Sequence, residues 1–257
     1  MITWFNKKIA DAGFIINLKQ RKDRLQSAYK ALDNANIKGI KRFNAVTGMP
    51  KPGNGCTQSH IDIAKLQIKH NWEYVLYLED DIHLDVFYDG QSENIDFKAV
   101  AGNISEELQY HKPDILWLGT RPLGPVEKIS NMFVKPSKTV MAHAYLGSLR
   151  YANFVVDNLD WRDQGCVSGG WPLDFFISEL NNKQDWRIYR EQLTNRESIL
   201  NNDLKIYMTI PNIFVQGPSH SDLENRFVDH KLWIKSCFEN WVNLSELNIK
   251  KILKRDE

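Results

Sequence analysis

The stretch "YVLYLEDDIH", residues 74–83, joins an apolar run directly to three carboxylates, Glu79, Asp80 and Asp81. Five largely apolar residues rich in Val, Leu and Tyr are typical of a buried β-strand. Adjacent carboxylates repel one another and hold their protons more tightly unless a positive charge lies between them. The stretch therefore indicates either a solvated turn at a strand end or a site that holds a cation.

The composition is that of a folded intracellular protein with one main domain. The 257 residues are 42% hydrophobic, and 33 Lys and Arg nearly balance 32 Asp and Glu, which leaves a net charge of +1. This balance gives no general attraction for nucleic acid, so no nucleic-acid partner is expected. The 3 cysteines are widely spaced and form neither a disulfide framework nor a C-x-x-C metal site. The sequence has no apolar run of the roughly 20 residues that a membrane span needs, and we expect a cytoplasmic location.

Apolar runs alternate with helix-forming stretches along the first half of the chain. Strands are expected at 12–18, 40–46, 74–78 and 114–119, helices at 19–37, 56–70 and within 85–110, and a loop at 47–55. This alternation indicates an α/β fold with a mostly parallel sheet. Beyond residue 125 the order is less regular, with strands expected at 140–148, 204–208 and 212–216, helices at 149–159 and 169–180, and a helical tail from 231.

The three carboxylates follow the strand at 74–78, and ligands of α/β sheets bind beyond the carboxyl ends of strands. If the strand geometry continued through residue 81, alternation would place Glu79 and Asp81 on one face and Asp80 on the other. Hard carboxylate oxygens suit Mg²⁺ or Mn²⁺ bound together with a diphosphate. The alternative is a solvated turn in which an Asp caps the next helix.

Seven blocks in chain order resemble family 25 glycosyltransferases, which include bacterial lipopolysaccharide and lipooligosaccharide galactosyltransferases and procollagen galactosyltransferases. The blocks are "FIINLKQRKDRL" (14–25), "FNAVTG" (43–48), "GNGCTQSHI" (53–61), "YVLYLEDD" (74–81), "AHAYLGS" (142–148), "PLDFFI" (172–177) and "IPNIFVQGPSHSDL" (210–223). The resemblance implies a GT-A fold, a Rossmann-like α/β domain with a mixed, mostly parallel sheet. We assign this domain to residues 1–228 and a C-terminal helical tail to 229–257. The acidic triplet then matches a variant of the D-x-D motif.

The resemblance places nucleotide-binding residues after the carboxyl end of the first strand and at the start of the second helix. Asn17, Arg21 and Arg24 leave the strand where a base and ribose would lie, and an Arg fork suits phosphate. The alternative is that Arg21 and Arg24 lie on a helix surface, paired with Asp23 or other acids. Ser59 and His60 open the second helix, whose N-terminal amides could face the donor phosphates. His60 is either a polar pocket residue or a supporting one, and the supporting role is preferred. Cys56 is interpreted as a small core residue in preference to a functional one.

Two later residues complete the expected site. Asp174 opens a helix after a Gly-Gly-Trp-Pro loop and is expected to take the acceptor hydroxyl's proton, although an Asp at a helix N-terminus also stabilises the helix by itself. His220 is expected as a metal ligand beside Glu79 and Asp81, with Asp80 assisting the donor. His143 competes for that role, but its strand-like neighbours favour a core or acceptor-site histidine.

The acidic triplet and this resemblance together predict a metal-dependent hexosyltransferase that uses Mn²⁺ or Mg²⁺ and a UDP-sugar. The resemblance implies inversion at the anomeric carbon and UDP-galactose as the first choice of donor. The acceptor would be a glycan of a lipooligosaccharide, surface polysaccharide or glycoprotein. A catalytically silent nucleotide-sugar-binding or scaffolding module is the main alternative. A metal-dependent phosphoesterase is a second one, but the sequence offers no second cluster of metal ligands. The tail combines aromatic residues with lysines, which fits either weak peripheral contact with an anionic membrane or packing on its own domain.

Overall fold

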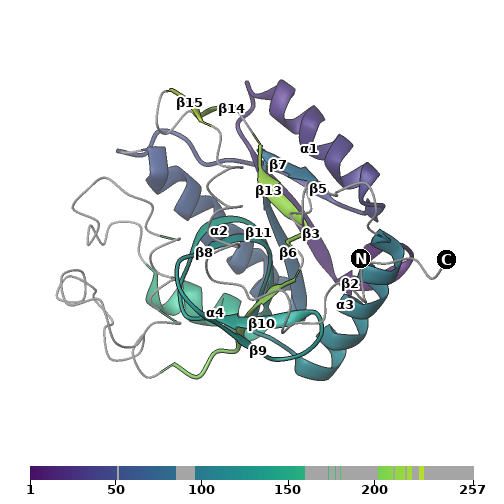
Figure 1. The fold of residues 1–257 in the computed structure, drawn as a ribbon. Coiled ribbons are helices and arrows are strands. Elements are labelled where there is room, and N and C mark those ends of the chain that lie inside the picture. Colours follow the sequence, from purple (N-terminus) through teal and green to yellow (C-terminus); the bar gives the residue numbers. More distant parts are fainter. Residues whose placement is uncertain are drawn as a thin grey trace.

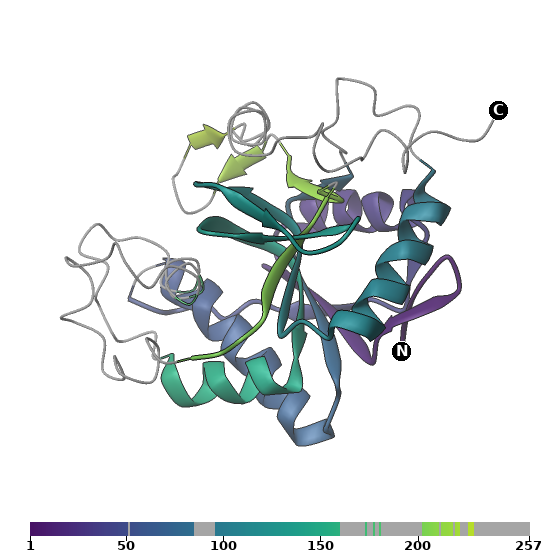
Figure 2. The ribbon, with the colours of Figure 1, turned by 60° about the horizontal axis from the view of Figure 1, so that its bottom comes forward.

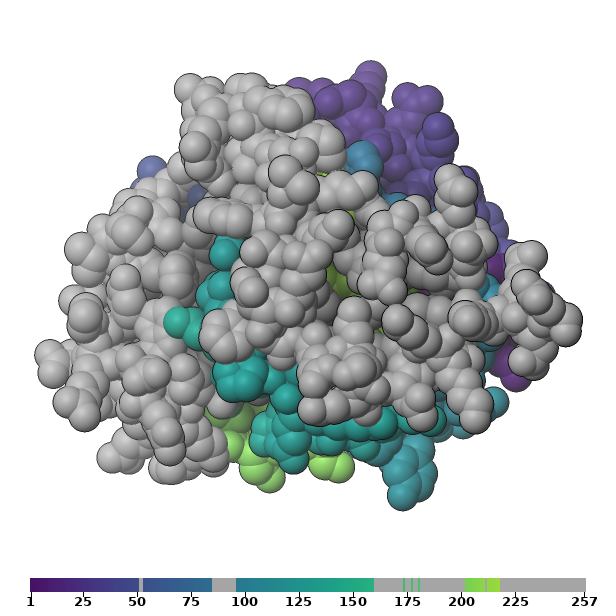
Figure 3. Space-filling model, viewed as in Figure 1, coloured from purple at the N-terminus to yellow at the C-terminus, as the bar shows by residue number. Residues whose placement is uncertain are grey.

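The structure is a computed structural model that describes residues 1–50, 52–84, 96–159, 173, 177, 180, 202–210, 212–217, 219–221 and 226–228. Figure 3 marks the remaining residues in grey. Asp174 and the tail at 229–257 lie outside the described residues. Leu173, Ile177 and Leu180 are helical and buried, in agreement with the helix expected at 169–180.

A twisted eight-stranded sheet forms the centre of the described structure (Figure 1). Its strands, in spatial order, are β5 (Lys41–Asn44), β3 (Ala12–Asn17), β6 (Tyr74–Glu79), β11 (Thr139–Ser148), β8 (Ile115–Pro122), β12 (Ile206–Thr209), β10 (Phe133–Pro136) and β9 (Val126–Lys128). Only β11 and β10 run against the other six strands. The prediction of a mixed, mostly parallel α/β sheet is therefore confirmed.

Four helices of the described part cover the two faces of this sheet (Figure 2). Helices α1 (Lys22–Asn34) and α3 (Phe97–His111) lie on one face, and α2 (Pro52–His70) and α4 (Leu149–Asn158) lie on the other. Alternate residues of β6 enter the two cores, because Val75 and Tyr77 join the cluster under α2 and α4. Leu76 and Leu78 join the cluster under α1. Burial on both faces explains why "YVLYL" is apolar throughout and not alternating.

Two elements differ from the sequence prediction. A small three-stranded sheet at the N-terminus, in the order β2 (Lys7–Ala10), β1 (Ile2–Trp4) and β4 (Ile37–Lys38), was not expected. Helix α2 begins at Pro52, so the loop predicted at 47–55 was wrong for its last residues. Proline is well tolerated in the first turn of a helix, where its missing N–H needs no partner. A Cβ at Gly55 would lie 2.4 Å from the Val46 carbonyl oxygen, so only glycine allows this close contact.

Two short strands bring a late segment of the chain against the turn at Asp80 and Asp81, here called the acidic turn. Strand β7 (Ile82–Leu84) pairs with β13 (Phe214–Gln216) in antiparallel register, with Gln216 opposite Ile82. The Gly217 N–H then donates to the Asp81 carbonyl oxygen at 2.9 Å. The chain continues into β14 (Ser219–Ser221), which pairs with β15 (Arg226–Val228). None of the described helices is both long enough and apolar enough to cross a lipid bilayer.

Candidate functional site

The candidate site lies where β3 and β6 end side by side. The two strands are parallel, and Ile16 of β3 is in register with Glu79, the last residue of β6. Strand β6 stops at Glu79, and Asp80 and Asp81 form a turn before β7. The strand alternation that would have aligned Glu79 with Asp81 therefore does not continue. Asp80 and Asp81 share Arg24 as a partner, whereas Glu79 contacts residues of α2.

Asp80 is held by two donors from the first βα unit. Asn17 Nδ2 donates to Asp80 Oδ2 at 2.7 Å, and Arg24 Nη1 donates to Asp80 Oδ1 at 3.0 Å. Asn17 is itself fixed, because its Nδ2 also donates to the Arg21 carbonyl oxygen and its Oδ1 accepts from Arg42 Nε at 2.8 Å. Both oxygens of a buried carboxylate are thus engaged, which makes Asp80 an anchor between α1 and the end of β6.

Asp81 contacts both Arg24 and β13. Its Oδ2 is 3.8 Å from Arg24 Nη1 and accepts a hydrogen bond from Gln216 Nε2 at 3.3 Å. Its Oδ1 is buried and has no hydrogen-bond partner among the residues that the structure describes. A buried carboxylate oxygen without a donor is costly, and a cation is one group that would satisfy it.

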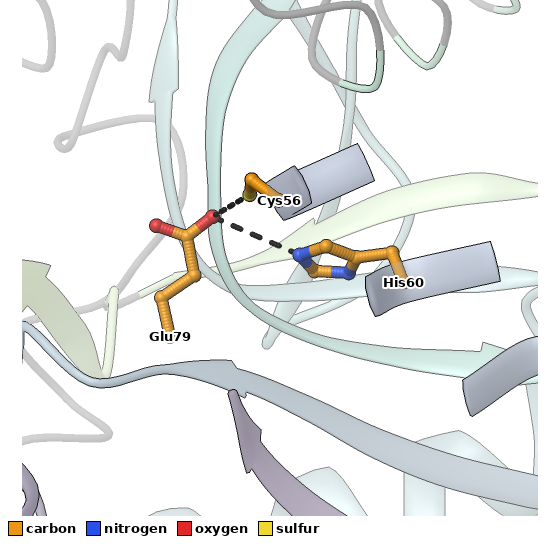
Figure 4. A group of neighbouring side chains, drawn as sticks. All are labelled: Cys56, His60 and Glu79. Atoms are coloured by element: carbon orange, nitrogen blue, oxygen red, sulfur yellow. Dashed lines mark hydrogen bonds and ion pairs between the residues drawn. The ribbon is translucent and has the colours of Figure 1, made fainter. Parts of the chain in front are cut away.

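Glu79 contacts two side chains of α2. Cys56 Sγ donates to Glu79 Oε1 at 3.5 Å, and His60 Nε2 lies 3.7 Å from the same oxygen. Cys56 and His60 are one helical turn apart on α2, so both side chains reach the carboxylate from the same helix face (Figure 4). Together these three residues form a cluster whose ligand atoms all lie within 4.8 Å of one another.

The His60 ring is fixed by aromatic side chains of the neighbouring strands. Its Nδ1 lies 2.9 Å from Tyr145 Oη, which is in turn 3.2 Å from Tyr151 Oη. The ring planes of Tyr77 and Tyr145 are each within 11° of the imidazole plane, with ring centroids 5.9 and 5.7 Å away. His60 is 1% exposed, so its position is set by packing and not by solvent.

Glu79 and Asp80 hold their protons more tightly than isolated carboxylates do. Burial, and then the charge of Asp81, raise the pKa of Glu79 to about 8. The same two causes raise the pKa of Asp80 to about 6, although Arg24 and Asn17 act in the opposite direction. A bound cation would favour the ionised forms, so the cluster has the electrostatics of a cation-binding site.

The structure brings some of the predicted residues together and leaves others apart. Asn17, Arg24, His60 and the three carboxylates meet at the ends of β3 and β6. Ser59 instead ties α2 to the preceding loop, since its Oγ donates to the Gly55 carbonyl oxygen at 2.7 Å and accepts from the Val46 N–H at 2.9 Å. Arg21 forms an ion pair with Asp23 at 3.1 Å, and Asp23 is the partner named for it in the alternative to nucleotide binding.

Two predicted residues are located less fully. Asp174 lies outside the described residues, so its role stays a prediction. His220 is described only by its backbone in β14, three residues after Gly217, whose N–H contacts Asp81. Three residues span at most about 11 Å, which bounds the distance of the His220 backbone from Gly217. His143 is fully buried with Nε2 3.2 Å from the Phe214 carbonyl oxygen, as expected for a core histidine.

Three residues that contact or support the site were not predicted as site residues from the sequence. Gln216 contacts Asp81, Arg42 supports Asn17, and Cys56 contacts Glu79. The signal for Cys56 was its position four residues before His60, which places both on one face of a helix. Gln216 stood inside the block that contains His220, but only the β7–β13 pairing shows which carboxylate it meets.

Comparison with known proteins adds little to this geometry. No family model and no curated protein matches the sequence. Among solved structures, a glycosyltransferase involved in the glycosylation of the major capsid of PBCV-1 matches with 8% sequence identity and a TM-score of 0.37. The match covers 77% of this chain and 92% of that chain. A likeness at this level establishes neither family nor activity, and the resemblance to family 25 remains a prediction from the quoted blocks.

Proposed function

We propose that this chain is a metal-dependent glycosyltransferase of the GT-A type that transfers a hexose from a UDP-sugar to a glycan hydroxyl. The observation that carries the proposal is the buried Asp81 Oδ1, which lacks a hydrogen-bond partner among the described residues and lies beside Glu79 and Asp80 at the end of β6. The carboxyl end of a strand in an α/β sheet is the usual place for a nucleotide ligand. The quoted sequence blocks supply the glycosyltransferase assignment.

In this proposal Glu79, Asp81 and His220 would hold Mn²⁺, or Mg²⁺ in its place. When bound, the ion neutralises the negative charge that develops on the departing diphosphate. Carboxylate oxygens are the ligand type that these hard cations prefer. Arg24, anchored by Asp80, supplies a fixed positive charge 3.8 Å from Asp81 and keeps this end of the sheet compatible with an anionic donor.

Asp174 would act as the base. It takes the proton of the acceptor hydroxyl while that oxygen attacks the anomeric carbon. The bond between the anomeric carbon and the diphosphate oxygen breaks, and UDP leaves with the electron pair. The resulting inversion, the choice of UDP-galactose, and the acceptor on a lipooligosaccharide, surface polysaccharide or glycoprotein follow from the family resemblance.

A cytoplasmic location and weak membrane contact through the tail at 229–257 belong to the same proposal. They suit a lipid-linked acceptor. Cosedimentation with anionic vesicles, compared with a chain truncated after residue 228, tests the contact. Equal binding of both forms would show that the tail is not the membrane contact.

Donor screening tests the function itself. The melting temperature is measured with UDP-, GDP- and CMP-sugars, with and without Mn²⁺, and UDP release is then followed for the stabilising donor. We expect stabilisation by a UDP-sugar only with the ion, followed by slow UDP release. Stabilisation without any turnover toward a glycan acceptor would favour the silent binding module. Release of UMP or inorganic phosphate in place of UDP would favour the phosphoesterase.

A further inference from the structure

We propose that Cys56, His60 and Glu79 form a second cation site, distinct from the carboxylate site at Asp81, which binds Zn²⁺ or a similar borderline-soft divalent cation. Thiolate, imidazole and carboxylate are the ligand types that zinc selects, whereas Mn²⁺ and Mg²⁺ prefer an all-oxygen or oxygen-rich set. The three residues come from one face of α2 and from the end of β6. Cys56 takes part in no disulfide.

The distances match a tetrahedral site closely. Zinc binds sulfur at about 2.3 Å and nitrogen or oxygen at about 2.0–2.2 Å, so ligand atoms of a tetrahedral site lie about 3.3–3.6 Å apart. Cys56 Sγ is 3.5 Å and His60 Nε2 is 3.7 Å from Glu79 Oε1. The third separation is within 4.8 Å, so a closure of at most about 1.2 Å by side-chain rotation would complete the set.

The surroundings of His60 are those of a metal-binding histidine. Such a histidine carries its proton on the other ring nitrogen and donates it to a neighbouring oxygen, which fixes ring orientation and basicity. Tyr145 Oη is 2.9 Å from His60 Nδ1 and can accept that proton while it donates to Tyr151.

Two of the three residues are partly exposed to solvent. His60 is buried, but the Glu79 side chain is 17% exposed and Cys56 is half-buried, so the ion can enter from their side. Cys56 would bind as a thiolate and release its proton to solvent. Three protein ligands leave the fourth tetrahedral position to water or another small ligand, as in open zinc sites.

Glu79 belongs to both donor sets, and this sharing has a functional consequence that rests on the proposed function. Zinc at Cys56 and His60 engages the carboxylate that the hard cation also needs. We therefore expect Zn²⁺ to inhibit a Mn²⁺-dependent transfer reaction, and excess Mn²⁺ to relieve the inhibition only partly, since manganese competes poorly for a thiolate.

Cobalt provides a spectroscopic test that does not depend on activity. Co²⁺ is titrated into a C166S/C237S variant, in which Cys56 is the only thiol, and thiolate-to-cobalt charge-transfer absorption is recorded in the near ultraviolet. We expect one equivalent of Co²⁺ to produce the band and Zn²⁺ to displace it. Absence of the band, with a melting temperature unchanged from the parent protein, would overturn the proposal.

Single substitutions in the same background identify the other ligands. Glu79→Gln and His60→Gln should each weaken Co²⁺ binding at least tenfold, and Tyr145→Phe should weaken it by about 10-fold or more because it removes the partner of Nδ1. Asp81→Asn is the matched control and should leave the band unchanged. Loss of the band in Asp81→Asn with retention in Glu79→Gln would also overturn the assignment. Because the band is read without nucleotide, a failed glycosyltransferase proposal and a failed zinc site give different results.

Discussion

Arg24 of α1 donates a hydrogen bond of 3.0 Å to Asp80, a residue 56 positions later in the chain. Both side chains are largely buried, at 13% and 9% exposed, so this contact fastens the first helix to the end of β6. Breaking a buried ion pair by removing one partner leaves an uncompensated charge. The contact therefore has consequences for stability as well as for the site.

Arg24→Ala should lower the free energy of unfolding by about 3 kcal/mol, because Asp80 would keep a buried charge with Asn17 as its one remaining donor among the described residues. Urea denaturation at pH 7 measures this. Lys38→Ala, which removes an exposed pair with Asp33, is the control and should cost less than about 1 kcal/mol. The double variant R24A/D80N should recover part of the loss, and an equal or larger loss would mean that Arg24 acts mainly through other contacts.

The raised pKa values of Glu79 and Asp80 predict an unusual pH dependence without metal. Their folded-state pKa values, about 8 and about 6, lie above the ordinary values of 4.5 and 3.8, so the folded protein binds these protons more tightly than the unfolded chain. Proton binding by Glu79 and Asp80 therefore stabilises the folded protein. This stabilisation is complete below their ordinary pKa values and is lost as the pH rises through their folded-state pKa values. The free energy of unfolding of metal-free protein should therefore fall between about pH 4 and 8, by about 1.4 kcal/mol for each unit of pKa difference.

Urea denaturation from pH 4 to 8 in the presence of a chelator checks this decline. Glu79→Gln removes the group with the larger shift and should flatten the upper part of the curve. A wild-type curve that rises steadily over the same range would contradict the assigned direction for both carboxylates.

Gln216→Ala tests whether the contact between β13 and the acidic turn supports the cation. Loss of the donor to Asp81 Oδ2 should weaken Mn²⁺ binding by about 10–100-fold, as is usual for a group that orients a ligand. Gln58→Ala, which removes a similar contact with Asp62 on α2, should leave Mn²⁺ affinity unchanged. Equal affinities for both variants and the wild type would show that Gln216 does not position Asp81 for an ion.

Asp174→Asn should reduce the transfer rate by about 10²–10⁴-fold while UDP affinity stays within a factor of two or so, because only the base is lost. Single-turnover rates and UDP titrations separate the two effects. If rate and affinity fell together, Asp174 would have a structural role, such as stabilising the start of its helix.

The strands at the centre of the fold were predictable because their sequences leave few alternatives. Residues 12–18 and 74–78 are short apolar runs bounded by polar residues, and both became strands buried on two faces. The N-terminal hairpin was missed because its strands are short and its two-residue turn has weak sequence signals. Phe5 and Asn6 both have positive φ, at 44° and 64°, which fits a tight hairpin turn, but Phe is rare in that conformation.

The site was predictable in its location but not in its internal arrangement. The carboxylates at the end of β6 were identified from the sequence, yet the strand ends at Glu79 and the following turn decides the direction of Asp80 and Asp81. Cys56 was interpreted as a core residue, because an isolated cysteine in a sequence does not by itself indicate a functional site. Its contact with Glu79 depends on the packing of α2 against β6, which no local pattern in the sequence specifies.

The central claim is that a divalent cation at Asp81 joins the protein to a nucleoside diphosphate. Isothermal titration of UDP into wild type, Asp81→Asn and the surface control Asp62→Asn, each with and without Mn²⁺, tests it most directly. We predict Mn²⁺-dependent UDP binding that is unchanged in Asp62→Asn and at least 100-fold weaker in Asp81→Asn, consistent with the loss of a buried charged ligand. Binding of UDP that is the same in Asp81→Asn and wild type, or that needs no metal, would contradict the account.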